Sequence, residues 1–140
     1  MEFKTIDKYT QMNHFGDLIG LDLKHISEGK AVYKITISKK HLATIKAAHG
    51  GLLSAILDTV MGVACLSKLE EEKKLVATIE FKTTFFAPAL INDELIATGE
   101  VIKKGKSLLF AQGKIVNQKN ELIANSSGSF KSYPAEKIGV

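Results

Sequence analysis

Hydrophobic and polar positions alternate along much of this chain, and this pattern predicts β-strands joined by tight turns. The clearest alternation runs through residues 31–37 and 75–86, and turn residues separate three further expected strands at 94–103, 107–117 and 122–133. Earlier in the chain, Leu21, Leu23 and Ile26 mark a first short strand. Residues 3–17 have the spacing of a short helix that ends near Gly16 or Gly20.

Residues 50–70 have a different pattern, because they are apolar nearly all round and predict a helix that is covered on both faces. One charged residue, Asp58, lies near the middle of this segment. In a membrane that carboxylate would cost about 2.5–3.5 kcal/mol, whereas the amphipathic strands offer the helix a protein surface to pack on. We therefore expect a core helix.

The expected order is a short helix, two strands, one long buried helix and then three or four strands. Strands grouped after a helix and joined by tight turns indicate an antiparallel sheet and an α+β architecture. We expect one domain over residues 1–140, in which a curved sheet wraps around the central helix. Sheets of this kind commonly pair edge to edge into dimers.

Composition narrows the choice of partner and compartment. The formal net charge is +4, and all basic residues are lysines, so the arginine contacts typical of nucleic-acid readers are missing. A modest positive field favours a small phosphorylated molecule instead, with neither nucleic acid nor membrane as a partner. A single cysteine, Cys65, and the lack of a secretory pattern at the N-terminus predict a cytoplasmic protein.

The start of the long helix carries the candidate chemistry. Gly50 and Gly51 follow His49 at the helix N-terminus, where free backbone N–H groups suit an anion or a polarised carbonyl. Asp58 follows two turns later among apolar residues, where a carboxylate is costly unless it is paired, hydrogen-bonded or used. A donor-rich helix start close to such an acid suggests catalysis.

These residues resemble a known family. His49-Gly50-Gly51 with Asp58 nine residues after the histidine, a strand at 77–81 that closes in Phe85 to Pro88, and the hairpin 103–107 are similar to the PaaI-type acyl-CoA thioesterases of the hotdog fold. The likeness runs from about Lys39 to Phe130. It implies a sheet of five to six strands around one helix, homodimers that often pair into tetramers, and hydrolysis of acyl-CoA without a metal or other cofactor.

The resemblance also implies roles for individual residues. The N–H of Gly50, next to Gly51, polarises the thioester carbonyl, Asp58 acts as nucleophile or general base, and Thr78 holds the water or the carboxylate. We expect His49 to orient the loop or cap the backbone rather than transfer a proton. Family members often carry asparagine six residues before the histidine, where this chain has Ala43, and Thr44 or His41 are the substitutes nearby.

The spacing of Gly50 and Asp58 predicts a shared site. Eight positions along one helix separate them by about 12 Å, whereas both groups must lie within about 3 Å of the reacting atoms. Two antiparallel copies of the helix solve this problem, because each lends its N-terminus to the other's aspartate. We therefore expect two sites per dimer, each with Gly50 from one subunit and Asp58 from its partner.

Substrate contacts are predicted on three surfaces. Lysines attract the phosphates of coenzyme A, and we assign this role to Lys39 and to the hairpin Lys103, Lys104, Gly105, Lys106 and Ser107. Phe85 and Pro88 are expected to flank the pantetheine channel. The acyl pocket is predicted at Leu53, Leu57, Met61 and Phe81.

Other interpretations remain open from the sequence. The protein is an acyl-CoA thioesterase or a non-catalytic module that binds acyl-CoA, with Ala43 favouring the second. A hotdog dehydratase that uses His49 and Asp58 as an acid–base pair is a third hypothesis. Asp58 is otherwise a buried acid satisfied by Thr59 or Ser54, and Cys65 is ordinary core. The four histidines have no metal-ligand spacing, so no metal site is expected.

Overall fold

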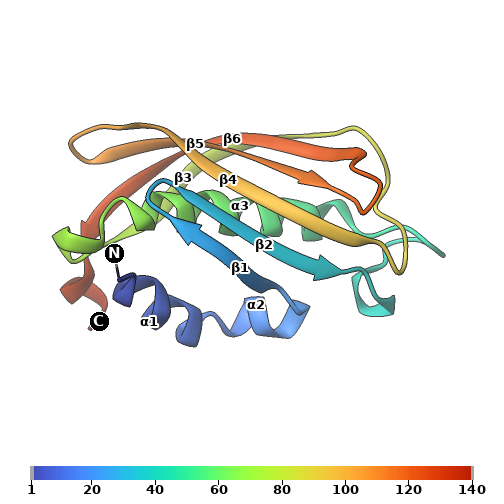
Figure 1. Ribbon diagram of the computed structural model, residues 1–140, viewed down its shortest axis with the longest axis horizontal. Helices are drawn as coiled ribbons and strands as arrows, with labels where there is room; N and C mark the ends of the chain where they lie inside the picture. Colours follow the sequence, from blue (N-terminus) through green and yellow to red (C-terminus); the bar gives the residue numbers. More distant parts are fainter. Residues whose placement is uncertain (1, 140) are drawn as a thin grey trace.

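A computed structural model describes residues 2–139 and contains a six-stranded antiparallel sheet (Figure 1). The strand order across the sheet is β1-β2-β4-β5-β6-β3. The strands are β1 (Asp22–Ser27), β2 (Lys30–Thr36), β3 (Lys74–Phe85), β4 (Glu94–Lys104), β5 (Leu108–Val116) and β6 (Leu122–Pro134). The helices are α1 (Lys4–Met12), α2 (His14–Ile19) and α3 (Gly50–Ser67), with short 3-10 turns η1 (Lys39–His41), η2 (Glu70–Glu72) and η3 (Ala135–Ile138).

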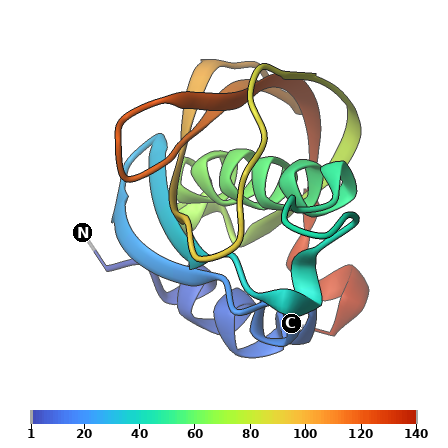
Figure 2. The ribbon, with the colours of Figure 1, turned by 90° about the vertical axis from the view of Figure 1, so that its right-hand side faces the viewer.

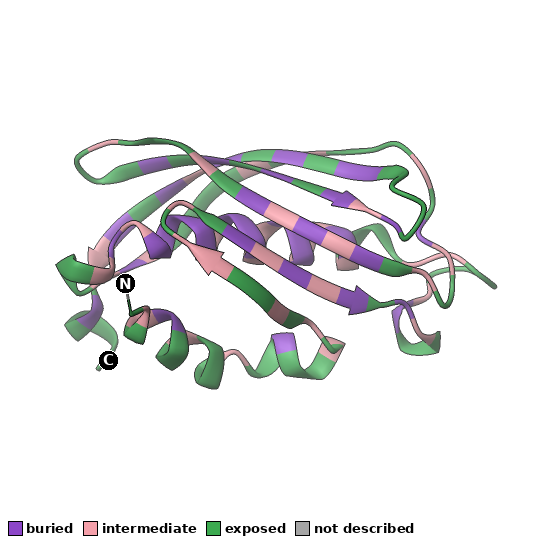
Figure 3. Cartoon of the chain, viewed as in Figure 1, coloured by how far each residue is buried: buried purple, intermediate pink, exposed green. Residues whose placement is uncertain are grey.

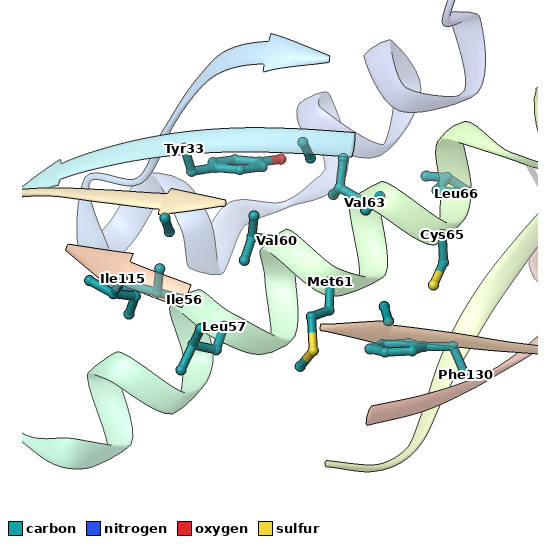
Figure 4. Close-up of a cluster of buried hydrophobic side chains, with 14 of the residues drawn as sticks. Tyr33, Ile56, Leu57, Val60, Met61, Val63, Cys65, Leu66, Ile115 and Phe130 are labelled. Atoms are coloured by element: carbon teal, nitrogen blue, oxygen red, sulfur yellow. The ribbon is translucent and has the colours of Figure 1, made fainter. Parts of the chain in front are cut away.

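The sheet curves around α3, as the order of elements predicted (Figure 2). Figure 4 shows side chains from successive turns of α3 pointing to the strands, and Ile56, Leu57, Val60 and Met61 have no exposed surface. By length and composition α3 is apolar enough to cross a membrane, but its apolar surface packs on β2–β6. The predicted α+β architecture, with a curved antiparallel sheet of six strands around one long helix, is confirmed.

The N-terminal segment differs from the single helix that we expected. It forms two helices, α1 and α2, with a break at Asn13. The Asn13 side chain accepts a hydrogen bond from the Gly16 N–H at 3.0 Å, so it caps the second helix. Asparagine is strongly favoured at such caps, and this preference outweighs continuation of α1. The second helix ends at Gly20, whose φ of 81° lies in the left-handed region.

Buried and exposed residues alternate along β2, β4 and β5, as the sequence pattern predicts (Figure 3). Strand β3 departs from this rule. The sequence placed Ile79 and Phe81 on one face and Thr78 on the other, but a β-bulge shifts the register between Thr78 and Glu80. Ile79 is consequently 53% exposed, while Thr78 and Phe81 pair with Phe130 and Gly128 on the helix-facing side of β6. A bulge inserts one residue and so reverses the alternation beyond it.

Candidate active site

The centre of the site is a hydrogen bond between α3 and the edge strand β3. The Thr78 hydroxyl donates to the Asp58 carboxylate at 2.7 Å. Asp58 is half-buried and Thr78 is exposed, so this hydrogen bond lies at the surface of the molecule. The Thr59 hydroxyl donates instead to the Ala55 carbonyl at 2.9 Å. The hydroxyl that contacts the Asp58 carboxylate is therefore that of Thr78 and not that of its neighbour Thr59.

The second part of the site is the N-terminus of α3. His49 is its N-cap, and the Nδ1 atom of His49 accepts the Gly51 N–H at 2.7 Å. The Leu52 and Leu53 N–H groups donate to the His49 carbonyl. Within residues 2–139 this leaves the Gly50 N–H without an acceptor. Gly50 is thus the available donor at a helix start, where a partial positive charge favours an oxyanion.

The aromatic ring of Phe85 lies beside this donor. A Cβ atom at Gly50 would be 3.5 Å from the Phe85 ring, which is ordinary contact. Phe85 and Pro88 are exposed, and Phe86 next to them is 54% exposed. Phe85 thus lies exposed beside the Gly50 donor.

A cavity of about 340 Å³ opens next to Asp58. It lies between α1, α3, the start of β3 and the end of β6, and its wall consists of Tyr9, Met12, Asn13, Asp58, Thr59, Gly62, Val63, Leu66, Leu75, Val76, Thr78, Phe130, Tyr133 and Ile138. None of the four residues predicted for an acyl pocket lines it. Leu53, Leu57 and Met61 of α3 are buried in the core instead, and Phe81 is half-buried against that core.

The lysine hairpin lies at the other end of α3 from Gly50. Lys104 donates to the carbonyl of Lys68, the C-cap of α3, and forms an ion pair with Glu72. A helix of 18 residues is about 27 Å long, so one chain cannot place this hairpin at its own Gly50. Lys103 shares the surface around Lys68, Gly105 is half-buried at the turn, and Lys106 and Ser107 are exposed. Lys39 is exposed in η1.

The loop before His49 holds both residues named as substitutes for the asparagine, Thr44 and His41, in hydrogen bonds within the chain. Ala43 and Thr44 are exposed near its tip, and the Thr44 hydroxyl accepts the Ala47 N–H at 3.1 Å. His41 is buried: its Nδ1 accepts the Ser38 N–H at 2.9 Å and its Nε2 lies 2.7 Å from the Ile19 carbonyl. Because both ring nitrogens are engaged, His41 ties α2 to this loop and is not free for a substrate.

Sequence reasoning missed the contribution of the chain's first residues. Tyr9 of α1 lies near Asp58: burial and the Asp58 carboxylate raise the pKa of Tyr9, while a side-chain hydrogen bond with Thr59 offsets part of that rise. The helical spacing of residues 3–17 indicated one buried face, but nothing in it showed that this face meets the middle of α3. The contact between α1 and α3 depends on the path of β1 and β2, which connect the two helices in the sequence.

Comparisons with known proteins agree with this geometry. The family model described as "Thioesterase superfamily" matches residues 46–124. The acyl-coenzyme A thioesterase PaaI of Escherichia coli is 31% identical over 106 residues, which cover 76% of this chain and 73% of that protein. Human acyl-coenzyme A thioesterase 13 is 24% identical over 116 residues, covering 82% and 81%.

Solved structures support the same fold. The E. coli PaaI structure superposes with a TM-score of 0.87 at 25% identity and covers 93% of this chain and 91% of that one. A Streptococcus mutans protein solved with acetyl CoA shares the fold, with a TM-score of 0.75 at 17% identity over 81% of this chain and 89% of that one. The chain therefore belongs to the thioesterase superfamily and is a PaaI-type enzyme of the hotdog fold.

Proposed function

We propose that this protein hydrolyses acyl-CoA thioesters to a carboxylic acid and free coenzyme A. The observation that carries the proposal is the Thr78–Asp58 hydrogen bond at 2.7 Å beside a largely apolar cavity. An oriented carboxylate suits attack on a thioester, and the cavity suits the acyl group. The relatives named acyl-coenzyme A thioesterases support this substrate class.

Each group has a defined task in this reaction. Asp58 attacks the thioester carbonyl or removes a proton from the attacking water, and Thr78 holds its carboxylate in place. The Gly50 N–H receives the developing oxyanion, a contribution whose loss typically costs about 3–4 kcal/mol. His49 fixes the loop, because its Nδ1 accepts the Gly51 N–H, and we assign it this positioning role rather than a proton transfer. These residues need no metal or other cofactor.

The proposed unit is a homodimer with two shared sites. Strand β3 is an edge strand that pairs only with β6, and exposed Ile79, Phe85 and Phe86 lie along or just beyond it. Antiparallel pairing of two such edges covers these apolar side chains and the free backbone groups. It also brings Gly50 of one subunit toward Asp58 of the other. We also expect two such dimers to associate into a tetramer.

The same arrangement gives the lysines a place at the site. In an antiparallel dimer the C-terminal end of one α3 lies toward the N-terminal end of the other. The hairpin with Lys103, Lys104 and Lys106 then approaches the partner's helix start, where Lys39 also lies. We propose that these lysines hold the phosphates of coenzyme A. We also propose that the protein acts in the cytoplasm.

A mixed-dimer experiment tests both the chemistry and the shared site. Asp58→Asn removes the reactive carboxylate. Gly50→Pro removes only the N–H, because proline is favoured at the first position of a helix and His49 already has the extended backbone that precedes proline (φ −65°, ψ 136°). Each variant alone should lose nearly all CoA release. After refolding together, half of the dimers are mixed and carry one intact site, so about a quarter of wild-type activity should return.

Two outcomes would contradict the proposal in different ways. Full CoA release by Asp58→Asn would overturn the assigned chemistry, and no recovery in the mixed dimer would overturn the shared site. Gly50→Ala is the matched control, because it keeps the N–H and its Cβ meets Phe85 at ordinary contact distance.

The exposed Ala43, which offers no amide to the site, favours a second candidate: a module that binds acyl-CoA without efficient hydrolysis. Tight binding by calorimetry without CoA release in a thiol assay would support that candidate. An enoyl-CoA hydration assay tests the remaining hypothesis of a dehydratase, for which we expect no product.

A further inference from the structure

We propose that the terminal segments of this chain form the acyl pocket, and that Tyr9 and Gly62 set the size of the acyl group to a compact one. This inference rests on the proposed function, because it assigns the acyl end of the same substrate. The predicted class is a single ring with a short linker or a short to medium straight chain. Long fatty acyl groups should be poorer substrates.

The cavity beside Asp58 joins an oriented carboxylate to apolar walls. Its wall begins at Asp58 and Thr78 and continues over Val63, Leu66 and Val76. A larger concavity, of about 490 Å³, lies on the outer face of the sheet and is lined by polar residues such as Lys82, Glu100 and Gln112. An acyl group whose carbonyl is held at Asp58 therefore enters the first cavity.

Both ends of the chain line the part of this cavity that lies away from Asp58. Tyr9 and Met12 come from α1, and Tyr133 and Ile138 follow from β6 and η3. In Figure 1, α1 and the C-terminal turn lie at the same end of the molecule. Six of the fourteen lining residues lie outside the segment that matches the superfamily: Tyr9, Met12, Asn13, Phe130, Tyr133 and Ile138. The terminal segments thus supply a large part of the wall that an acyl group would meet.

The volume limits the acyl group. A cavity of about 150 Å³ lined by apolar residues accepts one benzene ring. The present cavity, about 340 Å³, is roughly twice as large, and the thioester carbonyl of the substrate occupies part of it. Rings from Tyr9, Phe130 and Tyr133 line it, and aromatic pairs add about 0.5–1.5 kcal/mol beyond area burial.

Tyr9 is the residue of this wall that also approaches the reacting atoms. It is half-buried, and its phenol lies close enough to the Asp58 carboxylate to feel that charge. Gly62 lies one turn after Asp58 on α3, and a Cβ there would meet the Phe130 ring at 3.6 Å, which is ordinary contact. A larger side chain at Gly62 consequently projects into the cavity without disturbing the backbone. Tyr9 and Gly62 together therefore limit the space that the acyl group can occupy in this cavity.

The test measures kcat/KM for acetyl-, butyryl-, hexanoyl-, phenylacetyl-, lauroyl- and palmitoyl-CoA. Wild-type protein should prefer hexanoyl- or phenylacetyl-CoA over palmitoyl-CoA by about tenfold or more. Tyr9→Ala should raise the ratio of lauroyl- to hexanoyl-CoA hydrolysis by about tenfold, and Gly62→Leu should lower hexanoyl- relative to acetyl-CoA hydrolysis by a similar factor. Phe15→Ala is the matched control: it also removes a ring from the N-terminal helices, but Phe15 is 55% exposed and does not line the cavity, so the profile should not change.

A binding arm separates this inference from the proposed function. Calorimetry of the same acyl-CoA series with Asp58→Asn protein, with and without Gly62→Leu, measures acyl selectivity without turnover. A palmitoyl preference, or a profile unchanged by both Tyr9→Ala and Gly62→Leu, would overturn the inference even if hydrolysis is normal. If Tyr9→Ala does not fold, as judged by circular dichroism, Tyr9→Leu and Gly62→Leu decide the question. Loss of hydrolysis with the selectivity of binding intact would instead overturn the proposed function alone.

Discussion

At the scale of single residues, the site depends on one short hydrogen bond. Thr78 is exposed and holds the Asp58 carboxylate from a different element, so neither residue has its orientation without the other. The sequence identified both through the resemblance to thioesterases, and the structure brings them together. It could not identify Tyr9, because the contact between α1 and α3 joins residues about fifty positions apart, which no local pattern records.

Removal of the Thr78 hydroxyl should slow turnover without unfolding the protein. A hydrogen bond to a charged group contributes about 1.5–3 kcal/mol, so Thr78→Ala should lower kcat by about 10- to 100-fold. Thr78→Ser retains the hydroxyl and is the matched control, with activity close to wild type. Steady-state kinetics with hexanoyl-CoA checks this, and an unchanged kcat in Thr78→Ala would show that Asp58 needs no such support.

Cys65 provides a second test at this scale, through pH. Burial raises the pKa of the Cys65 thiol to about 12 from an ordinary value of 9.0. The folded protein therefore keeps this proton at pH values where the unfolded chain loses it, so its contribution to stability is complete below pH 9 and falls as pH rises toward 12. Urea unfolding from pH 8 to 10.5 should show a steeper loss of stability for wild type than for Cys65→Ala. Parallel pH slopes would contradict this.

At the scale of elements, sequence patterning predicted the strands and the long helix well. It failed where a helix cap or a β-bulge interrupts the regular spacing of hydrophobic residues. The hydrophobic run of residues 50–70 is long and continuous, so the predicted bounds of α3 are close to the observed Gly50–Ser67. The bulge at Ile79 has no such signal, because alternation is intact in the sequence and the extra residue is accommodated only when β3 pairs with β6. The bulge nevertheless has a functional effect, since it places Thr78 and Phe81 on the same face.

The backbones of α3 and the sheet approach closely at Gly99 of β4, and a side chain there should be destabilising. A Cβ at Gly99 would collide with the Val60 carbonyl of α3, which is backbone and has little freedom to move. Gly99→Ala should therefore cost about 1–3 kcal/mol or more in the free energy of unfolding. Gly62→Ala is the contrasting variant, because its Cβ is accommodated and alanine favours a helix by up to about 1 kcal/mol over glycine. Equal stabilities by urea denaturation would refute this difference.

At the scale of the whole molecule, the proposed dimer makes the exposed edge of β3 essential. Ile79→Asp places a charge at that edge and should yield a monomer with almost no turnover, because each site would lack its partner's Gly50. Ile102→Asp introduces the same charge at a residue of β4 that is 60% exposed, and this control should remain dimeric and active. Sedimentation velocity and CoA release on the same samples check both. An active monomer would show that one chain suffices.

The buried ring of His41 offers a built-in spectroscopic reporter. Its Nδ1 accepts the Ser38 N–H while its Nε2 faces the Ile19 carbonyl, so the ring proton is held on Nε2 and shielded from solvent. The His41 carbonyl in turn accepts a hydrogen bond from the N–H of His49, the N-cap of α3. Such a proton should exchange slowly with water and give its own resonance in a nitrogen-15 NMR spectrum. A change in that resonance when substrate arrives would record the movement of the loop directly, without a label or a mutation.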